Sequence, residues 1–430
     1  MEAIRFILLS GLALFAFGCA QSKTSSSVFP GTQGLSASCE QQALPNQFIV
    51  QWEDGRFTVE SDDDSAEHFR KSFVEKNLEK IKHVDHDFIV QIKNNDTTAL
   101  QQFATQDADT SGGWGPEQMK ASALWAQDLH GDGVLVGVID GMVDVTHQQL
   151  QPNIAINTNE IANNGIDDDN NGYVDDVYGI KLTTEINDPT QNTHGSHVAG
   201  IIAADPSKGD SIKGIVHGVA DRAKIIPAQF IENNGSGNIS SAILAINYVV
   251  KRGAKIINLS WGAGTCADIP TLKATLQKAS EQGVLIVTAA GNGDDNYHIG
   301  LNTDVYPTIP GSYNLSTQIN VAASTYDDYL TSFTNFGLKT VHVAAPGSNI
   351  LSTIPGDKVV TESGTSMASP MVAGAAALLW GAFPSATALQ IKQALLSSVD
   401  IIAGHPFEVS SRGRINIEKA YAQLQKSLTP

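Results

Sequence analysis

Three polar residues, an aspartate, a histidine and a serine, stand where apolar segments of the sequence begin or end. Asp140 follows the β-branched run 134–139, His194 precedes a run of small and apolar residues, and Ser366 lies between a glycine-containing turn and a helix expected over 371–380. A serine hydroxyl attacks a carbonyl carbon well only if an imidazole takes its proton and a buried carboxylate holds that imidazole in the right tautomer. The three residue types together therefore indicate nucleophilic catalysis of acyl transfer.

Each of these residues also has an ordinary structural interpretation when it is taken alone. An aspartate after a strand is commonly a turn or capping residue, and a serine or threonine before a helix is commonly an N-cap, which Ser366 or Thr365 would be. His194 and His197 lie three residues apart, as metal ligands can, but no third ligand stands at a recognisable spacing. The case for catalysis therefore depends on the three residues occurring together.

The segments around these residues resemble the signature segments of the subtilase family of serine proteases. His194–Gly200 reads HGSHVAG and Gly364–Pro370 reads GTSMASP, and both follow Asp140 in the family's chain order of Asp, His and Ser. The Gly-x-Ser-x-Gly turn of α/β-hydrolases is absent, because Ala368 stands two residues after the serine. The resemblance covers about 114–422 and implies a serine-type endopeptidase with the three polar residues as its catalytic triad.

Further matches to the family lie between these segments. Asn292 stands in a segment similar to the one whose asparagine donates to the oxyanion of the tetrahedral intermediate. The resemblance also implies two backbone segments between which a peptide would lie as an added strand. These are Ser260, Trp261 and Gly262, at one wall of the primary pocket, and Gly235, Ser236 and Gly237 opposite them. Taken alone, Asn292 would be a loop residue and the glycine segment a flexible turn.

The sequence departs from the family directly after the aspartate. Gly141 and Met142 replace the usual threonine or serine followed by glycine. The hydroxyl that is lost could orient Asp140 through a hydrogen bond, and methionine adds bulk where glycine permits close packing. We expect an active enzyme with altered activity. The alternative is a catalytically impaired surface lipoprotein that uses the same fold as a binding module.

The elements that must position these residues alternate along the chain. Amphipathic stretches predict helices over 239–252 and 271–282, and short β-branched runs between them predict strands. The expected strands are 134–139, 223–230, 256–259, 284–289, 319–322 and 341–344. Continuous apolar strands with crossover helices indicate a parallel sheet covered on both faces. The fold class is therefore α/β, with a doubly wound parallel sheet. The resemblance implies that this sheet is subtilisin-like and belongs to a catalytic domain over 107–430.

A smaller α+β unit over 46–106 precedes this domain. Its pattern predicts a strand at 48–52, a helix at 65–80, a strand at 86–92 and a helix at 97–103. This unit resembles the family's inhibitory propeptide, which assists folding and is then cleaved. We expect it to inhibit the chain's own cleft until the exposed loop between Gln106 and Gly113 is cut.

Residues 1–19 have the pattern of an export signal. Arg5 is followed by an apolar run that ends at Phe17, which is too short to span a bilayer comfortably. Cys19 resembles the lipidated cysteine of bacterial lipoproteins, although an ordinary cleaved signal fits equally well. Residues 20–45 are rich in Ser, Thr, Gly and Gln and predict a flexible linker. The sequence thus predicts an extracellular or cell-envelope protein that meets a membrane only through a lipid anchor.

An acidic stretch, 167–176, matches the first half of an EF-hand calcium loop, with oxygen ligands at alternate positions and glycine sixth. The twelfth position holds Tyr178 instead of glutamate, which excludes the full motif. The expected ligands are the side chains of Asp167, Asp169, Asn171 and Asp175 and the carbonyl of Tyr173. The sequence predicts a structural Ca²⁺ loop, with an acidic surface turn as the alternative.

Composition narrows the partners that the chain can have. Its 430 residues, 42% of them hydrophobic, can bury a large core with a small domain beside it. The formal net charge of −18 disfavours nucleic acid, whose phosphates require clustered Lys and Arg. Cys39 and Cys266 could form a disulfide in an exported protein or remain separate thiols. We expect a monomer without an organic cofactor, whose partners are polypeptide substrates and its own propeptide.

Overall fold

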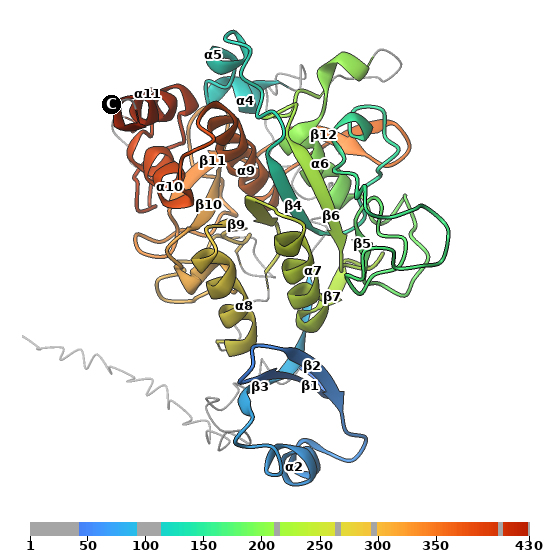
Figure 1. Ribbon diagram of the computed structural model, residues 1–430. Coiled ribbons are helices and arrows are strands. Elements are labelled where there is room, and N and C mark those ends of the chain that lie inside the picture. Colours follow the sequence, from blue (N-terminus) through green and yellow to red (C-terminus); the bar gives the residue numbers. More distant parts are fainter. Residues whose placement is uncertain are drawn as a thin grey trace, which may run out of the picture.

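The computed structural model describes residues 43–92, 113–209, 216–262, 268–293, 299–402 and 407–428. The expected signal segment, the three cysteines, the helix at 97–103 and nearly all of the expected cleavage loop lie outside these ranges. Figure 1 shows a larger body with a smaller unit beneath it. In the described part of the chain, no helix is both long and apolar enough to cross a membrane.

The larger body is built on a seven-stranded parallel sheet with the order β11-β10-β9-β8-β4-β6-β5. Its strands are β4 (Leu135–Asp140), β5 (Ile180–Lys181), β6 (Lys224–Gln229), β8 (Ile256–Leu259), β9 (Leu285–Ala289), β10 (Gln318–Ser324) and β11 (Val343–Pro346). The α/β prediction is confirmed. The last strand begins two residues later than expected, and β5 is too short for periodicity to reveal it.

Helices cover both faces of this sheet. On one face lie α6 (His194–Ala203) and α9 (Thr365–Ala382), and on the other lie α7 (Ile239–Lys251) and α8 (Pro270–Glu281). Because side chains alternate along a strand, Val136 and Val138 join the α9 core while Ile139 joins the α7 core. Helix α7 approaches Gly137 so closely that a Cβ at this position would lie 2.8 Å from the Val249 side chain.

Shorter helices and a hairpin complete this body. They are α4 (Trp114–Gln118), α5 (Ser122–Trp125), α10 (Ala388–Ser397), α11 (Ile417–Leu428), and the strands β12 (Ile350–Ile354) and β13 (Lys358–Glu362). The hairpin packs on α6, because Thr353 Oγ1 and Ser352 Oγ donate to the carbonyls of Ser196 and His197 at 2.8 and 2.7 Å. It therefore fixes the residues just before α9 against the start of α6.

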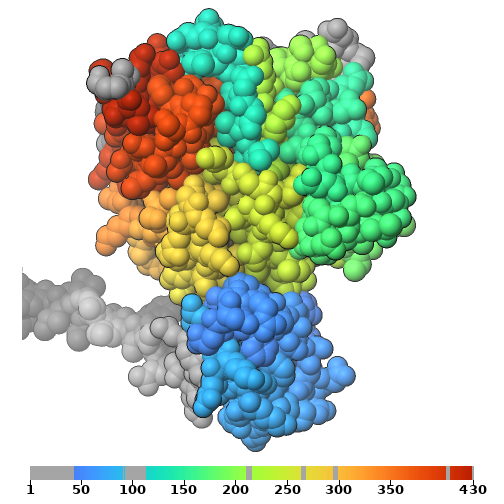
Figure 2. Space-filling model, viewed as in Figure 1, coloured from blue at the N-terminus to red at the C-terminus, as the bar shows by residue number. Residues whose placement is uncertain are grey.

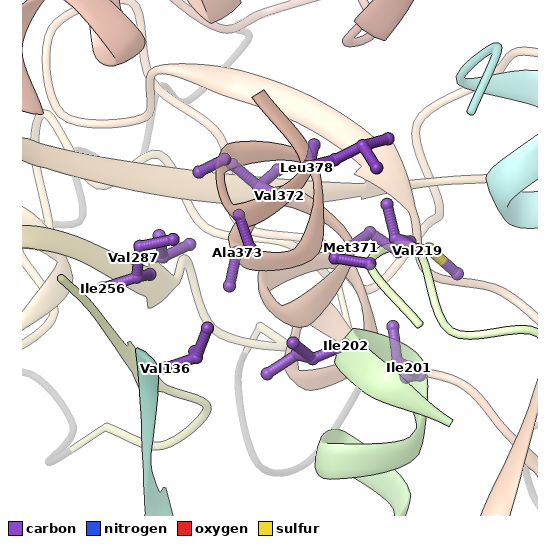
Figure 3. Packing of buried hydrophobic residues seen from close by; sticks show 14 of the residues in the cluster. Val136, Ile201, Ile202, Val219, Ile256, Val287, Met371, Val372, Ala373 and Leu378 are labelled. Carbon is purple, nitrogen blue, oxygen red and sulfur yellow. The ribbon is translucent and has the colours of Figure 1, made fainter. Parts of the chain in front are cut away.

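The central helix α9 is buried along most of its length, which its alanines and glycines allow. Figure 3 shows Met371, Val372 and Ala373 packed among apolar side chains of the sheet and of α6. The helix begins at Thr365, so the expected start at 371 was wrong. Proline is normally tolerated only in the first turn of a helix, whereas Pro370 lies inside α9.

The smaller unit is an antiparallel sheet with a short helical segment against it. It contains β1 (Ala43–Trp52), β2 (Phe57–Ser61), α2 (Ala66–Phe69), the π-turn Arg70–Val74 and β3 (Ile81–Gln91). Ser65 caps α2 by accepting a hydrogen bond from the His68 amide at 3.1 Å. The predicted helix over 65–80 is therefore too long, and β2 was missed, because the hairpin strand is half exposed and carries little apolar signal.

Candidate active site

The residues predicted to do chemistry gather at the carboxyl ends of neighbouring parallel strands. Asp140 is the last residue of β4, Ser260 directly follows β8, and Asn292 comes three residues after β9. His194 is the first residue of α6 and Ser366 is the second residue of α9. Ligands bind at this edge of open α/β sheets, because strand-to-helix connections meet there.

A hydrogen bond of 2.7 Å joins His194 Nδ1 to Asp140 Oδ1. Asp140 is fully buried and His194 is nearly so. Burial lowers the pKa of His194, but the charge and hydrogen bond of Asp140, together with the charge of Glu362, raise the pKa overall. A buried carboxylate that holds Nδ1–H leaves Nε2 as the base, which is the tautomer needed to accept a proton from a hydroxyl.

The Ser366 side chain is held by the strand end opposite it. Its hydroxyl donates to the Ser260 carbonyl at 2.9 Å, so in this conformation it does not donate to His194. Apo enzymes often have such long or misdirected catalytic contacts, which tighten when substrate binds. Pro370 has no N–H for the Ser366 carbonyl, and Ser260 Oγ donates to that carbonyl instead, also at 2.9 Å.

Asn292 is anchored through one half of its amide. Its Oδ1 accepts hydrogen bonds from the amide and the hydroxyl of Thr365, both at 2.9 Å. The Nδ2 group is thereby directed away from Thr365, toward Gly364, where a Cβ would lie 3.3 Å from it. Thr365, Met367 and Ala368 already use their amides in hydrogen bonds to Asn292 Oδ1 and to the Gly364 carbonyl, so Nδ2 and the Ser366 amide are the donors that can converge on a developing negative charge.

The segment predicted to bind substrate opposite the pocket is a short strand, β7 (Ser236–Asn238), and the smaller unit covers it. β3 pairs with it antiparallel, with Val90 opposite Gly237, and the Ile92 amide donates to the Gly235 carbonyl at 2.7 Å. The strand edge at which the sequence predicts an added peptide strand is therefore occupied by the chain's own N-terminal unit.

The same unit also contacts the ends of two helices. Figures 1 and 2 show it beneath α7 and α8. Asp87 accepts hydrogen bonds from the Ser240 amide and hydroxyl at the start of α7, at 3.0 and 2.6 Å, and Asp85 accepts one from the Thr271 amide at the start of α8, at 2.8 Å. Burial raises the pKa of Asp85 to about 6, although the Thr271 hydrogen bonds oppose this rise. These carboxylates satisfy first-turn amides that lack a partner within the helix.

Trp261 does not line an open surface. Its side chain is 3% exposed, its Nε1 donates to the Ile139 carbonyl at 2.9 Å, and its ring contacts Phe230 edge to face. The Ser260 hydroxyl is likewise engaged with Ser366 and Asn258. The Ser260 and Trp261 side chains are therefore buried, so the backbone of this segment is what a substrate strand could pair with.

Comparison with known proteins agrees with this arrangement. A model of the subtilase family, peptidase S8, matches residues 131–422, which is more than half of the chain. The chain belongs to the subtilase family. It is 35% identical to the major intracellular serine protease of Bacillus subtilis, over 62% of this chain and 74% of that protein. It is 31% identical to thermitase of Thermoactinomyces vulgaris, over 71% of this chain and 95% of that protein.

A third relative is much longer than this chain. Subtilisin-like protease 1 of Plasmodium berghei is 31% identical over 66% of this chain, but the match spans only 48% of that protein. These matches, together with the residues at the strand ends, identify this subtilase as a serine-type endopeptidase. The match begins at residue 131, so it does not include the smaller unit.

The acidic stretch of this subtilase folds differently from the predicted ligand set. Asp167 accepts hydrogen bonds from the backbone amides of Asn171 and Gly172. Asp175 accepts hydrogen bonds from the backbone amides of Asn164 and Gly165. The oxygens that come within 4.8 Å of one another belong instead to Glu160, Asp169 and Asp176. Of the predicted side chains, Asp169 lies in this group, and Asn171 donates its Nδ2 to Asp176 at 3.1 Å.

This carboxylate group fits a hard cation. Glu160 and Asp176 are 7% and 2% exposed, and Glu160 Oε2 is buried without a hydrogen-bond partner among the described residues. The amides of Asn157 and Asn171 and the hydroxyl of Tyr248 donate into the group. Arg252, 3.6 Å from Asp176, compensates part of its negative charge. Carboxylate oxygens are ligands that Ca²⁺ prefers. Glu160 was missed because it precedes the repeat of alternating acids that carries the sequence signal.

Three other residues of interest were not found from the sequence. The charge of Glu362 raises the pKa of His194. Asp85 and Asp87 accept hydrogen bonds from helices that lie more than 150 residues later in the chain. None of them belongs to a recognisable motif. Only the folded chain brings them to the site.

Proposed function

We propose that the chain cleaves polypeptides through an acyl-enzyme formed on Ser366. The observation that carries this proposal is the buried hydrogen bond between Asp140 and His194, beside a serine in the first turn of α9. Family membership supports it. A chance arrangement is a poor explanation, because the residues of the site come from five separate segments of the chain: Asp140, His194, Ser260, Asn292 and Ser366.

In the proposed mechanism the Ser366 hydroxyl turns from the Ser260 carbonyl to His194 when substrate binds. His194 Nε2 takes the hydroxyl proton while Ser366 Oγ attacks the scissile carbonyl, and Asp140 stabilises the imidazolium that forms. Asn292 Nδ2 and the Ser366 amide stabilise the oxyanion. His194 then protonates the leaving amine, and water releases the acyl group by the same steps in reverse roles.

Casein hydrolysis by the wild type and by Ser366→Ala tests this proposal. The wild type should release peptides, and the variant should lose activity about 10³-fold or more, since the nucleophile has no substitute. Asn292→Ala should retain binding and lose about 100-fold in kcat or more. Equal and negligible hydrolysis by wild type and Ser366→Ala would instead support the alternative, a catalytically impaired lipoprotein that binds a partner with this fold.

We further propose that the N-terminal unit inhibits the enzyme until it is cut off, and that the chain is exported as this precursor. The pairing of β3 with β7 supports inhibition, because the unit uses the edge that a substrate strand would need. N-terminal sequencing of purified enzyme tests processing. A mature N-terminus after Ile92 and before Trp114 is expected, and the interval contains the predicted loop between Gln106 and Gly113. An active enzyme that begins upstream of β3 would contradict the proposal.

A structural calcium ion is a second proposal, now with Glu160, Asp169 and Asp176 as its carboxylate ligands. Glu160 supports it most strongly, since a buried carboxylate oxygen without a partner is costly unless a cation or proton binds it. The amides of Asn157 and Asn171 could turn their oxygens toward the same ion. Calcium would bind only the folded chain and so stabilise it.

The thermal midpoint with calcium and with chelator tests this site and separates the two ligand sets. Calcium at about 100 times its Kd adds about 2.7 kcal/mol, which corresponds to a rise of roughly 5 °C in a domain of this size. Glu160→Gln should abolish the rise, and Asp175→Asn, the matched control, should keep it. A midpoint that chelator does not change would refute the site.

A further inference from the structure

The Asn192 side chain lies beside the turn that follows Asp140, two residues before His194. It is 4% exposed. Its Oδ1 accepts a hydrogen bond from the Met142 amide at 2.9 Å, and its Nδ2 donates to the Ile231 carbonyl at 3.0 Å. One amide group therefore joins the turn after β4 to the segment after the neighbouring strand β6.

This amide occupies the space in which a side chain at position 141 would lie. A Cβ built on Gly141 would be 2.2 Å from Asn192 Oδ1, well below the 3.0 Å at which something must shift. Glycine at 141 and the present position of Asn192 are therefore two parts of one arrangement. In the sequence, position 141 is the place where the family usually has threonine or serine.

Hydrogen bonds from the two segments that Asn192 connects also hold Asp140. The Gly141 amide donates to Asp140 Oδ1 at 2.6 Å, and the amides of Phe230 and Ile231 donate to the Asp140 carbonyl at 3.0 and 3.3 Å. Asp140 Oδ2, by contrast, is buried without a hydrogen-bond partner among the described residues. Apart from His194, the orientation of this carboxylate therefore depends on the backbone of the turn, through the Gly141 amide.

From this geometry we propose that Asn192 is the positioning residue for Asp140, through its hydrogen bonds to the turn after β4 and to the segment after β6. Asn192 acts through Asp140 on the His194 imidazole and touches neither Ser366 nor the oxyanion donors in the described contacts. The proposal rests on the function proposed above, because it assigns Asn192 a part in the same proton transfer.

Asn192→Ala tests this proposal in the full chain. We expect kcat to fall by about 100-fold, the cost of misplacing a catalytic group by about 1 Å, with KM changed less than about twofold. The acid limb of the pH profile should move to lower pH, because a displaced carboxylate supports the His194 charge less. Gln191→Ala is the matched control: the side chain of this exposed neighbour donates to Asp188, and all three readouts should keep their wild-type values. An unchanged kcat in Asn192→Ala would overturn the proposal.

A second pair of variants tests the shared space. Gly141→Ser alone should lose activity, and Gly141→Ser combined with Asn192→Gly should regain at least about 10-fold of it, because the clash is removed and a hydroxyl returns. Independent, additive effects of the two changes would overturn the proposal.

The low-field NMR resonance of the His194 Nδ1–H proton reports on the hydrogen bond to Asp140 and does not require an active enzyme. It should be present in the wild type, shifted or lost in Asn192→Ala, and retained in Gln191→Ala. An inactive wild type that still shows these differences would refute the proposed function alone. A resonance that is unchanged in Asn192→Ala would refute the role of Asn192.

Discussion

Asp87→Ala should weaken the hold of the N-terminal unit on the enzyme. The Asp87 carboxylate accepts two hydrogen bonds from Ser240, at the start of α7, and one from Gln47 within its own unit, at 2.7 Å. Removing it leaves the Ser240 amide without its acceptor, at about 1 to 3 kcal/mol for a buried donor. The Ser240 hydroxyl can still donate to Asn238 Oδ1, which lies 3.0 Å away. Part of this cost is offset, because the variant no longer buries a charged carboxylate and water can enter the space. We therefore expect the unit to lose about 2 kcal/mol of binding free energy, or about 30-fold in affinity.

The measurement uses the precursor after it has cut itself. Processed wild type and variant are diluted over a range of concentrations, and the steady-state activity gives the apparent inhibition constant of the cleaved unit. Asp87→Asn should weaken inhibition by less than about 5-fold, because its amide oxygen still accepts from the Ser240 amide. Glu79→Ala, which removes an exposed acid from the same unit, is the control and should have no effect.

Two results would refute this reasoning. Inhibition by Asp87→Ala within about twofold of the wild type would mean that the helix-start contact contributes nothing. A loss in Asp87→Asn as large as that in Asp87→Ala would mean that the negative charge at the helix start, and not the hydrogen bonds, holds the unit.

Three further predictions concern the charges and hydrogen bonds of the site. Glu362→Gln should shift the acid limb of the kcat/KM profile to lower pH, because Glu362 raises the pKa of His194 and only the neutral imidazole accepts the proton; an unmoved limb would show that its charge does not reach the ring. Asp85 has a pKa of about 6 when bound and about 3.9 when free in solution, so its contribution to inhibition is complete below about 3.9 and is lost as the pH rises through 6. The inhibition constant should rise by up to about 100-fold across that interval, and a constant that does not change with pH would contradict this. Ser260→Ala should lower the thermal midpoint by roughly 2 to 4 °C, since the Ser366 carbonyl loses the donor that replaces the Pro370 N–H; an unchanged midpoint would mean that water satisfies this carbonyl.

The sequence by itself determined the fold class and the residues of the proposed triad. The signals are local: β-branched runs predict strands, and each motif lies within a few residues of a strand end or helix start. Local signals failed where neighbours in space decide the outcome. The half-exposed strand β2 has no strong pattern, and α9 continues through Pro370 because Ser260, more than 100 residues earlier, satisfies the carbonyl that the proline leaves free.

The tertiary structure alone decided which oxygens form the carboxylate group and how Asp140 is supported. Alternating acids in the sequence favoured Asp167 and Asp175, yet both carboxylates are used by backbone amides of the loop, and the buried Glu160 from an earlier turn takes their place. Likewise, the sequence shows at Gly141 only the loss of a hydroxyl. The fold shows that the Asn192 side chain occupies the space where a side chain at position 141 would lie. Hydrogen-bonding groups are satisfied by whatever lies near them in space, and sequence spacing does not record which residues those are.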